Sequence, residues 1–215
     1  VCQLWIILKS CKQCLKKCSH GLVKQLRLHI SNVLKLAHTV IHYLNVYETT
    51  SNMNIFYLDK DPVKAARLQY NKHVVKMILE SAQMLCTAHH CYGDKYQVEN
   101  VPYKQAHLNH PSTVWTRRSK STYMWLYNHM IALGDEYTKR YGKTHLSITK
   151  CKDFLAIPPK HIQGEEFTQP PQAMPDEYKD ECSIQAYWNY YIGEKHVVVN
   201  KNKEKLYEQR PKETY

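Results

Sequence analysis

The stretch DPVKAARLQYNKHVVKMILESAQMLCTAHH (61–90) decides the fold class of this 215-residue chain. Its apolar residues recur three and four positions apart, which is the spacing of one buried helix face. They are Ala66, Tyr70, Val74, Met77, Ile78, Ala82 and Leu85. Asp61 followed by Pro62 is typical of a helix start, because the carboxylate caps free N–H groups and proline fits the first turn. The pattern predicts one helix from Val63 to about His89.

Downstream, the same spacing predicts a second helix over residues 111–141, which ends at Gly142 after two basic residues. A polar loop is expected over residues 93–109. Residues 157–175 hold five prolines, which predicts an extended surface loop. A third helix is expected over residues 177–194, and no strand pattern of useful length appears.

The sequence thus predicts a mostly α fold: a single compact domain of about three main helices with long surface loops, residues 53–215. A basic, Cys-rich segment, residues 1–52, precedes it and carries +6 of the net charge of +11. Its residues 22–44 have the pattern of an amphipathic cationic helix. Two interpretations stay open for residues 1–52: a functional arm, or upstream sequence outside a working protein that starts at Met53.

Cys11, Cys14, Cys18 and His20 have the donor types of a zinc site, but the second ligand pair is more compressed than in zinc fingers. We expect reduced thiols, since no secretory signal is present. Neither a P-loop nor a dinucleotide-binding glycine pattern occurs. No apolar run reaches the ~18 residues of a membrane span, so no membrane association and a cytoplasmic location are expected. The excess of cations favours a polyanionic partner, with nucleic acid first.

Lys72, Lys76 and Glu80 stand four residues apart and share one helix face, with His73 beside them. If this face lines a cleft, Glu80 could act as a general base and a lysine amine could form a Schiff base. If the face is solvated, the three residues form only a ladder of surface ion pairs, each worth a few tenths of a kcal/mol.

A basic and aromatic cluster in the second helical stretch is the main candidate for DNA contacts. In it the cations would neutralise phosphates and the aromatic rings would support an unstacked base. Its members are Trp115, Arg117, Arg118, Lys120 and Tyr123. A further basic patch near the tail ends at Arg210.

A histidine-rich group offers an alternative, a metal-dependent nuclease or phosphohydrolase site. It comprises His107, His110, His129 and His145, with Asp135 or Asp153. No adjacent His-Asp pair and no His-Glu-x-x-His motif supports this alternative.

Several segments resemble the pyrimidine-dimer DNA glycosylase family, the phage endonuclease V group. They are MNIFYLD (53–59), KHVVKMILE (72–80), NHPSTVW (109–115), STYMWLYNHMIALGDEYTKRYG (121–142) and EQRPKETY (208–215). The first two also resemble uncharacterised phage proteins. In the family a histidine precedes the catalytic glutamate by seven positions, as His73 precedes Glu80 here.

The resemblance implies a small all-α enzyme without metal or cofactor that flips a nucleotide from double-stranded DNA, in a bacterial or phage-infected cell. It gives Glu80 the role of the catalytic glutamate and gives the nucleophile's role to the amine of Met53 or Asn54. Asn109 and His110 match the family's Asn-His-Pro segment. The family's N-terminal threonine is absent.

Two arginines of the family are replaced here by Leu79 and Gln83. If residues 1–52 are retained, Lys76 is the nearby substitute amine. The predicted function is therefore a repair enzyme, a glycosylase with abasic-site lyase activity on pyrimidine dimers. No protein partner is implied. The alternatives are a non-catalytic nucleic-acid-binding protein and the metal-dependent nuclease.

Overall fold

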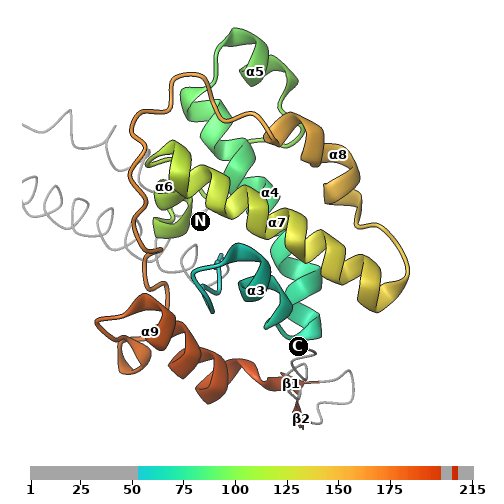
Figure 1. The fold of residues 1–215 in the computed structure, drawn as a ribbon, viewed down its shortest axis with the longest axis vertical. Helices are drawn as coiled ribbons and strands as arrows, with labels where there is room; N and C mark the ends of the chain where they lie inside the picture. The colour runs from blue at the N-terminus through green and yellow to red at the C-terminus, as the bar shows by residue number, and fades with distance from the viewer. Residues whose placement is uncertain (1–52, 200–204, 208–215) are drawn as a thin grey trace, which may run out of the picture. The chain divides into compact units, whose positions relative to one another are not determined.

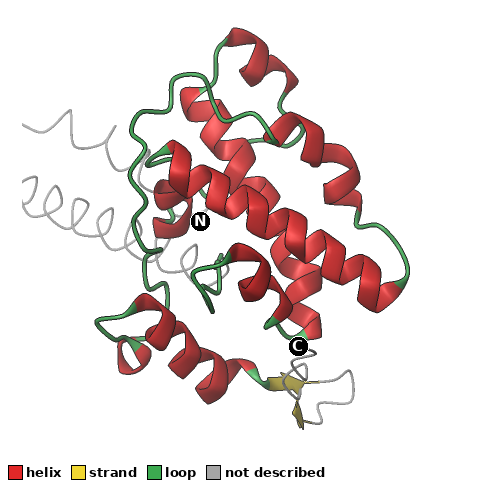
Figure 2. Cartoon of the chain, viewed as in Figure 1, coloured by secondary structure: helices red, strands yellow, loops and turns green. Residues whose placement is uncertain are grey.

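A computed structural model describes residues 53–199 and 205–207, all of which belong to the compact unit Thr49–Tyr215. These residues are mostly helical, which confirms the predicted fold class (Figures 1 and 2). The elements are α3 (Pro62–Arg67), α4 (Asn71–Tyr92), α5 (Lys95–Asn100), α6 (Pro111–Thr116), α7 (Lys120–Tyr141), α8 (Leu146–Leu155), η1 (Asp176–Tyr178), α9 (Ser183–Tyr190), η2 (Tyr191–Lys195), β1 (Val197–Val199) and β2 (Lys205–Tyr207). The two short strands pair antiparallel. Within the described ranges, no helix is both long and apolar enough to cross a bilayer.

The core forms where the two longest helices, α4 and α7, pack against each other (Figure 1). The apolar stripe predicted for residues 63–89 is buried, with Ala66 on α3, Tyr70 between α3 and α4, and the other members on α4. α7 buries Leu126, Met130 and Leu133. Helices α6 and α8 pack against both α4 and α7, and α3 packs against α7. Burying each large aliphatic side chain contributes about 1.5–3 kcal/mol, so the α4–α7 contact is the main stabilising feature of the domain.

The first predicted helix is wrong in one respect, because residues 68–70 interrupt it between α3 and α4. Asp61 caps α3 as predicted, accepting the N–H groups of Val63 and Lys64 at 2.7 and 3.0 Å. At the break, the Arg140 guanidinium donates to the carbonyl oxygens of Arg67 and Gln69. A side chain from α7 therefore satisfies carbonyl groups that a continuous helix would have used internally.

The second predicted helix also divides, into α6 and α7. Ser119 interrupts it and starts α7 with a capping box, in which Ser119 and Thr122 bond to each other's backbone N–H groups. The predicted stop at Gly142 is confirmed, since this glycine adopts the left-handed conformation at φ 67°.

Three further elements depart from the sequence prediction. α5 lies inside the predicted loop 93–109, where Asp94 and Gln97 form a capping box. α8 was not predicted, and its N-cap is His145, whose ring accepts the N–H of Ser147. The predicted helix 177–194 divides into η1, α9 and η2.

Residues 157–175, called the strap below, are extended as the prolines predict, and run from α8 past α6 to α9 (Figure 1). Its backbone carbonyls accept hydrogen bonds from side chains of several elements. The donors are Ser119, Ser121, Trp115, Asn54, Ser183 and Tyr187. The strap therefore ties the start of α7, the segment Met53–Leu58 and α9 together.

Some predictions lie outside the described residues. They are the cationic helix of residues 22–44, the Cys11, Cys14, Cys18 and His20 group, and the tail patch ending at Arg210.

Candidate active site around Glu80

Glu80 is a buried carboxylate on α4, with 5% of its surface exposed. One oxygen, Oε1, lies 2.9 Å from the Lys76 ammonium, whose side chain is 56% exposed. The other, Oε2, accepts the backbone N–H of Asn54 at 3.2 Å. The alternative of a solvated ladder of surface ion pairs is therefore wrong for Glu80. Its carboxylate is buried, and it contacts the Lys76 ammonium and the Asn54 backbone N–H.

The pKa of Glu80 is raised above its usual value. Burial is the largest cause, since it penalises the charged form, and the Lys76 ammonium and the Asn54 N–H partly offset it. A carboxyl group in this environment exchanges protons closer to neutral pH than a solvated one, which suits general acid–base chemistry.

The backbone nitrogen of Asn54 is held in place by its own side chain. The carboxamide oxygen accepts the N–H groups of Ile55 and Phe56 at 2.8 and 3.2 Å, and the amide nitrogen donates to the Ala173 carbonyl of the strap at 2.9 Å. Phe56 follows with a positive φ of 53°, which is rare for a bulky residue. Asn54 thus forms a fixed turn that directs its backbone N–H toward Glu80.

His73 packs against this turn. Its ring stacks on Phe56 with centroids 4.4 Å apart, and its Nδ1 lies 2.7 Å from the Tyr191 hydroxyl. That hydroxyl also accepts the backbone N–H of Tyr70 at 2.8 Å, so Tyr191 links His73 to the residue that precedes α4. Burial, with smaller contributions from nearby lysines, lowers the pKa of His73 to about 3, so the ring is neutral at physiological pH.

The structure brings the predicted catalytic residues together at one place: Met53, Asn54, His73, Lys76 and Glu80. Tyr191, Phe56 and the Ala173 carbonyl also belong to this site and were not predicted from the sequence. Phe56 lies within the MNIFYLD segment, but neither Tyr191 nor Ala173 is marked by any motif.

Two of the predicted DNA contacts are corrected. Tyr123 has no exposed surface, and Trp115 has 5%. The Tyr123 hydroxyl donates to the Leu155 carbonyl at 3.0 Å, and the Trp115 indole donates to the Thr168 carbonyl at 2.8 Å. Both rings belong to the core, so neither is available to stack on a base.

The cations of the same cluster lie at the junction of α6 and α7. Arg118 is exposed, and Lys120 pairs with Glu165 of the strap at 2.8 Å. Arg117 donates to the Leu108 carbonyl at 2.8 Å. These contacts join the cluster to neighbouring loops and not to the group around Glu80.

The other predicted contact residues are divided between two places. Asn109 is exposed, whereas His110 is buried and caps α6 by accepting the N–H of Ser112 at 3.1 Å. Lys72 lies half-buried on the Glu80 face of α4. Arg210 lies outside the described residues.

The histidine-based metal alternative is wrong for the residues that the structure describes. His110 and His145 cap different helices, and His129 is buried against Gln69 and the Pro62 carbonyl. In residues 53–199 and 205–207, no three His, Cys, Asp or Glu side chains gather closely enough to hold a metal ion.

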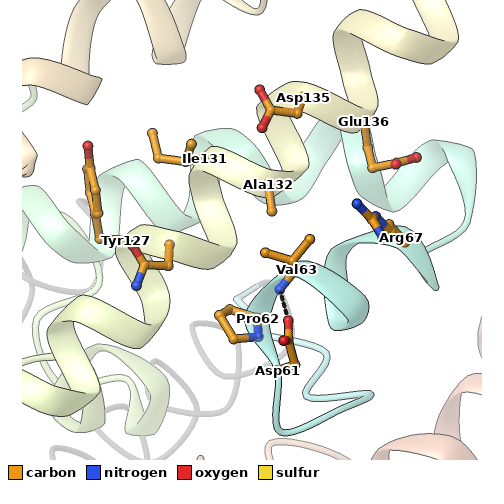
Figure 3. Close-up of a pocket in the computed structure, with 10 residues that line it drawn as sticks. Asp61, Pro62, Val63, Arg67, Tyr127, Ile131, Ala132, Asp135 and Glu136 are labelled. Atoms are coloured by element: carbon orange, nitrogen blue, oxygen red, sulfur yellow. Dashed lines mark hydrogen bonds between the residues drawn. The ribbon is translucent and has the colours of Figure 1, made fainter.

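A hollow of about 390 Å³ lies between α3 and α7 (Figure 3). Its lining residues are Asp61, Pro62, Val63, Arg67, Tyr127, Asn128, Ile131, Ala132, Asp135 and Glu136. Two of its carboxylates have structural partners, because Asp61 caps α3 and Glu136 pairs with Arg140 at 3.0 Å. The Glu80 group remains the better candidate for an active site.

Comparison of the chain with protein-family models, with curated proteins and with solved structures gave no match.

Proposed function

We propose that this protein is a DNA repair enzyme, a base-excision glycosylase with abasic-site lyase activity that uses a primary amine and Glu80. The observation that carries the proposal is the contact of 3.2 Å between the backbone nitrogen of Asn54 and the buried Glu80 carboxylate. In a chain that begins at residue 54, this nitrogen is a primary amine instead of an amide.

The chemistry follows from the position of that amine. The amine attacks C1′ of the deoxyribose, the bond between C1′ and the base breaks, and the base leaves with a proton. Opening of the sugar ring produces an imine, and elimination then breaks the bond to the 3′ phosphate. Glu80 accepts the proton of the attacking amine and stabilises the positive charge that develops on the sugar.

An α-amine suits this role better than an ordinary lysine. Its usual pKa of about 7.7–8.0 leaves a substantial unprotonated fraction at neutral pH, whereas a lysine amine titrates near about 10.4. Lys76, whose ammonium lies 2.9 Å from Glu80, is the second candidate nucleophile. In the 215-residue chain the nitrogen of Asn54 is part of a peptide bond, so of these two candidates Lys76 alone is an amine there.

The proposed substrate is double-stranded DNA that contains pyrimidine dimers, as the resemblance implies. The net charge of +11 supports a polyanionic partner. A base inside a duplex cannot reach a buried carboxylate, so the damaged nucleotide must leave the stack before reaction. We propose no cofactor, because the amine, the carboxylate and water are sufficient for both steps.

The test is cleavage of dimer-containing duplex DNA in EDTA by three chains: the 215-residue chain and chains that begin at Met53 or Asn54. We expect cleavage in EDTA, and the highest rate from the chain that begins at Asn54. Cleavage that requires a divalent metal would contradict the amine mechanism. Salt-sensitive binding with no cleavage by any of the three chains would assign the protein to the non-catalytic DNA-binding alternative.

A further inference from the structure

The exposed face of α4 carries two aliphatic side chains directly beside the candidate site. Val75 is 37% exposed and Leu79 is 41% exposed, whereas their neighbours Val74 and Ile78 have no exposed surface. Val75 and Leu79 are four residues apart, so they are adjacent on the helix surface, with their Cβ atoms about 5–6 Å apart. We call this pair the α4 ridge. Its apolar surface is not used by the core.

Cations border the α4 ridge. Lys72 and Lys76 lie on the same side of the helix, and Gln83 follows one turn beyond Leu79. Glu80 is the only acidic residue between Asn71 and Gln83, and it is buried. The outer surface of this half of α4 is therefore apolar in its centre and positive at its edge. Such a surface complements DNA, which has anionic phosphates on its outside and stacked apolar bases inside.

Leu79 lies one turn from Lys76, whose ammonium is 2.9 Å from the Glu80 carboxylate, so the ridge borders the lysine that pairs with this carboxylate. Proteins that unstack DNA insert apolar side chains such as leucine between base pairs, while neighbouring cations contact the phosphates. A ridge beside the carboxylate would open the duplex at the step where the reacting nucleotide must leave the stack.

We propose that the α4 ridge enters double-stranded DNA as a wedge at the damaged step, with Leu79 as the inserted side chain. This inference rests on the proposed function, since it assigns the way in which duplex DNA meets the Glu80 site. Lys72 and Lys76, which lie together on one side of the ridge, contact phosphates beside the inserted side chain. The occupant of the ridge is duplex DNA and not a protein partner or a lipid surface.

The test uses the 215-residue chain and a duplex with a tetrahydrofuran abasic analogue beside 2-aminopurine, whose fluorescence rises when it unstacks. The variants are Leu79→Ala and the double variant Val75→Ala/Leu79→Ala. Val114→Ala is the matched control, because Val114 is 45% exposed and lies on a different helix, α6. Melting followed by circular dichroism checks that each variant is folded.

We expect the wild-type chain and Val114→Ala to raise the fluorescence, and the double variant to lose most of that rise. The preference of the double variant for abasic over intact duplex should fall by about ten-fold, the contribution of one buried leucine side chain. Binding to intact duplex should remain, because the lysines are unchanged. A fluorescence rise in the double variant equal to that of the wild type would overturn the wedge, as would the absence of any rise in the wild type.

A second assay measures binding to phosphatidylserine vesicles. If the wild type and Val114→Ala bind the vesicles, the double variant does not, and all three unstack DNA equally, the ridge is a membrane-binding surface and the proposal is overturned. The fluorescence result does not depend on the proposed imine chemistry, because the tetrahydrofuran analogue cannot form an imine. Imine formation on natural abasic sites is measured separately, with the same substitutions in a chain that begins at Asn54. Loss of unstacking with imine formation retained in that chain supports the wedge and leaves the proposed function intact. Unstacking by the wild-type sequence with no imine formed by the chain that begins at Asn54 contradicts the proposed function alone.

Discussion

Replacement of Glu80 by glutamine separates a catalytic carboxylate from a structural one. Glutamine keeps the length and shape of the side chain, and its carbonyl oxygen can still accept the Asn54 N–H that lies 3.2 Å from Glu80. The substitution removes an ion pair with a lysine side chain that is 56% exposed. Burial opposes the charge of Glu80, as its raised pKa shows, so removing this charge offsets much of the lost ion pair. We therefore expect the free energy of unfolding to change by less than about 1 kcal/mol.

The effect on the reaction should be much larger. A general acid–base group contributes about 10²–10⁴-fold to the rate, which corresponds to about 2.7–5.4 kcal/mol of barrier. The assay is single-turnover cleavage of abasic duplex DNA by a chain that begins at Asn54, with unfolding in urea measured in parallel. We expect Glu80→Gln to lower the cleavage rate by at least about a hundred-fold.

Glu136→Gln is the matched control. Glu136 also pairs with a cation four residues away on a long helix, Arg140 at 3.0 Å, but on α7 and away from Asn54. We expect this variant to be less stable than the wild type, because the pair is largely buried, and to keep the wild-type cleavage rate in its folded state. If Glu80→Gln cleaves at a rate close to that of Glu136→Gln, the reasoning that assigns Glu80 a catalytic role is refuted.

Three other predictions follow from the fold and its charges. Burial lowers the pKa values of three histidines, to about 3 or about 4: His73, His89 and His129. The neutral rings contribute stability above about pH 6.5, and this contribution is lost as the pH falls toward the lowered pKa values, by up to about 1.4 kcal/mol per pH unit for each histidine. Urea unfolding at pH 7, 6 and 5 measures the loss. Equal free energies of unfolding at all three pH values would contradict this prediction. Gly142→Ala should destabilise by about 1 kcal/mol, because φ is 67° there, and an unchanged melting temperature would argue against it. Replacing Arg117 and Arg118 by alanine should flatten the dependence of log affinity for duplex DNA on log salt, by about 0.9 for each phosphate that the variant no longer neutralises; an unchanged slope would place the phosphate-binding surface elsewhere.

The sequence predicted the parts of the fold that depend on local pattern. The apolar stripe of residues 63–89 and the stop at Gly142 depend on neighbouring residues, and both are present in α4 and α7. The break at residues 68–70 was not predictable, since the group that satisfies its carbonyl oxygens comes from Arg140, about seventy positions later. α8 escaped prediction because its cap is a histidine, which is not among the usual capping residues.

The site was partly predictable for the same reason. The spacing of Lys76 and Glu80 indicated a shared helix face, and the two side chains do meet, at 2.9 Å. The burial of Glu80 was not visible in the helix pattern, because it depends on the segment Met53–Leu58 that the strap holds over α4. Trp115 and Tyr123 were misassigned because basic neighbours suggested a DNA surface. Both rings are buried: Trp115 bonds to the strap, and Tyr123 contacts His89 of α4 and Leu155 of α8.

Borohydride trapping on abasic-site DNA, followed by peptide mapping of the adduct, tests the central claim most directly. Borohydride reduces the imine and makes the link between protein and DNA permanent, so the mapped residue is the nucleophile. We expect a chain beginning at Asn54 to be trapped through the amine of that residue, whose nitrogen lies 3.2 Å from Glu80. We expect the 215-residue chain to be trapped far less. Equal trapping of both chains, with the adduct mapped to Lys76, would contradict the assignment of the amine at residue 54.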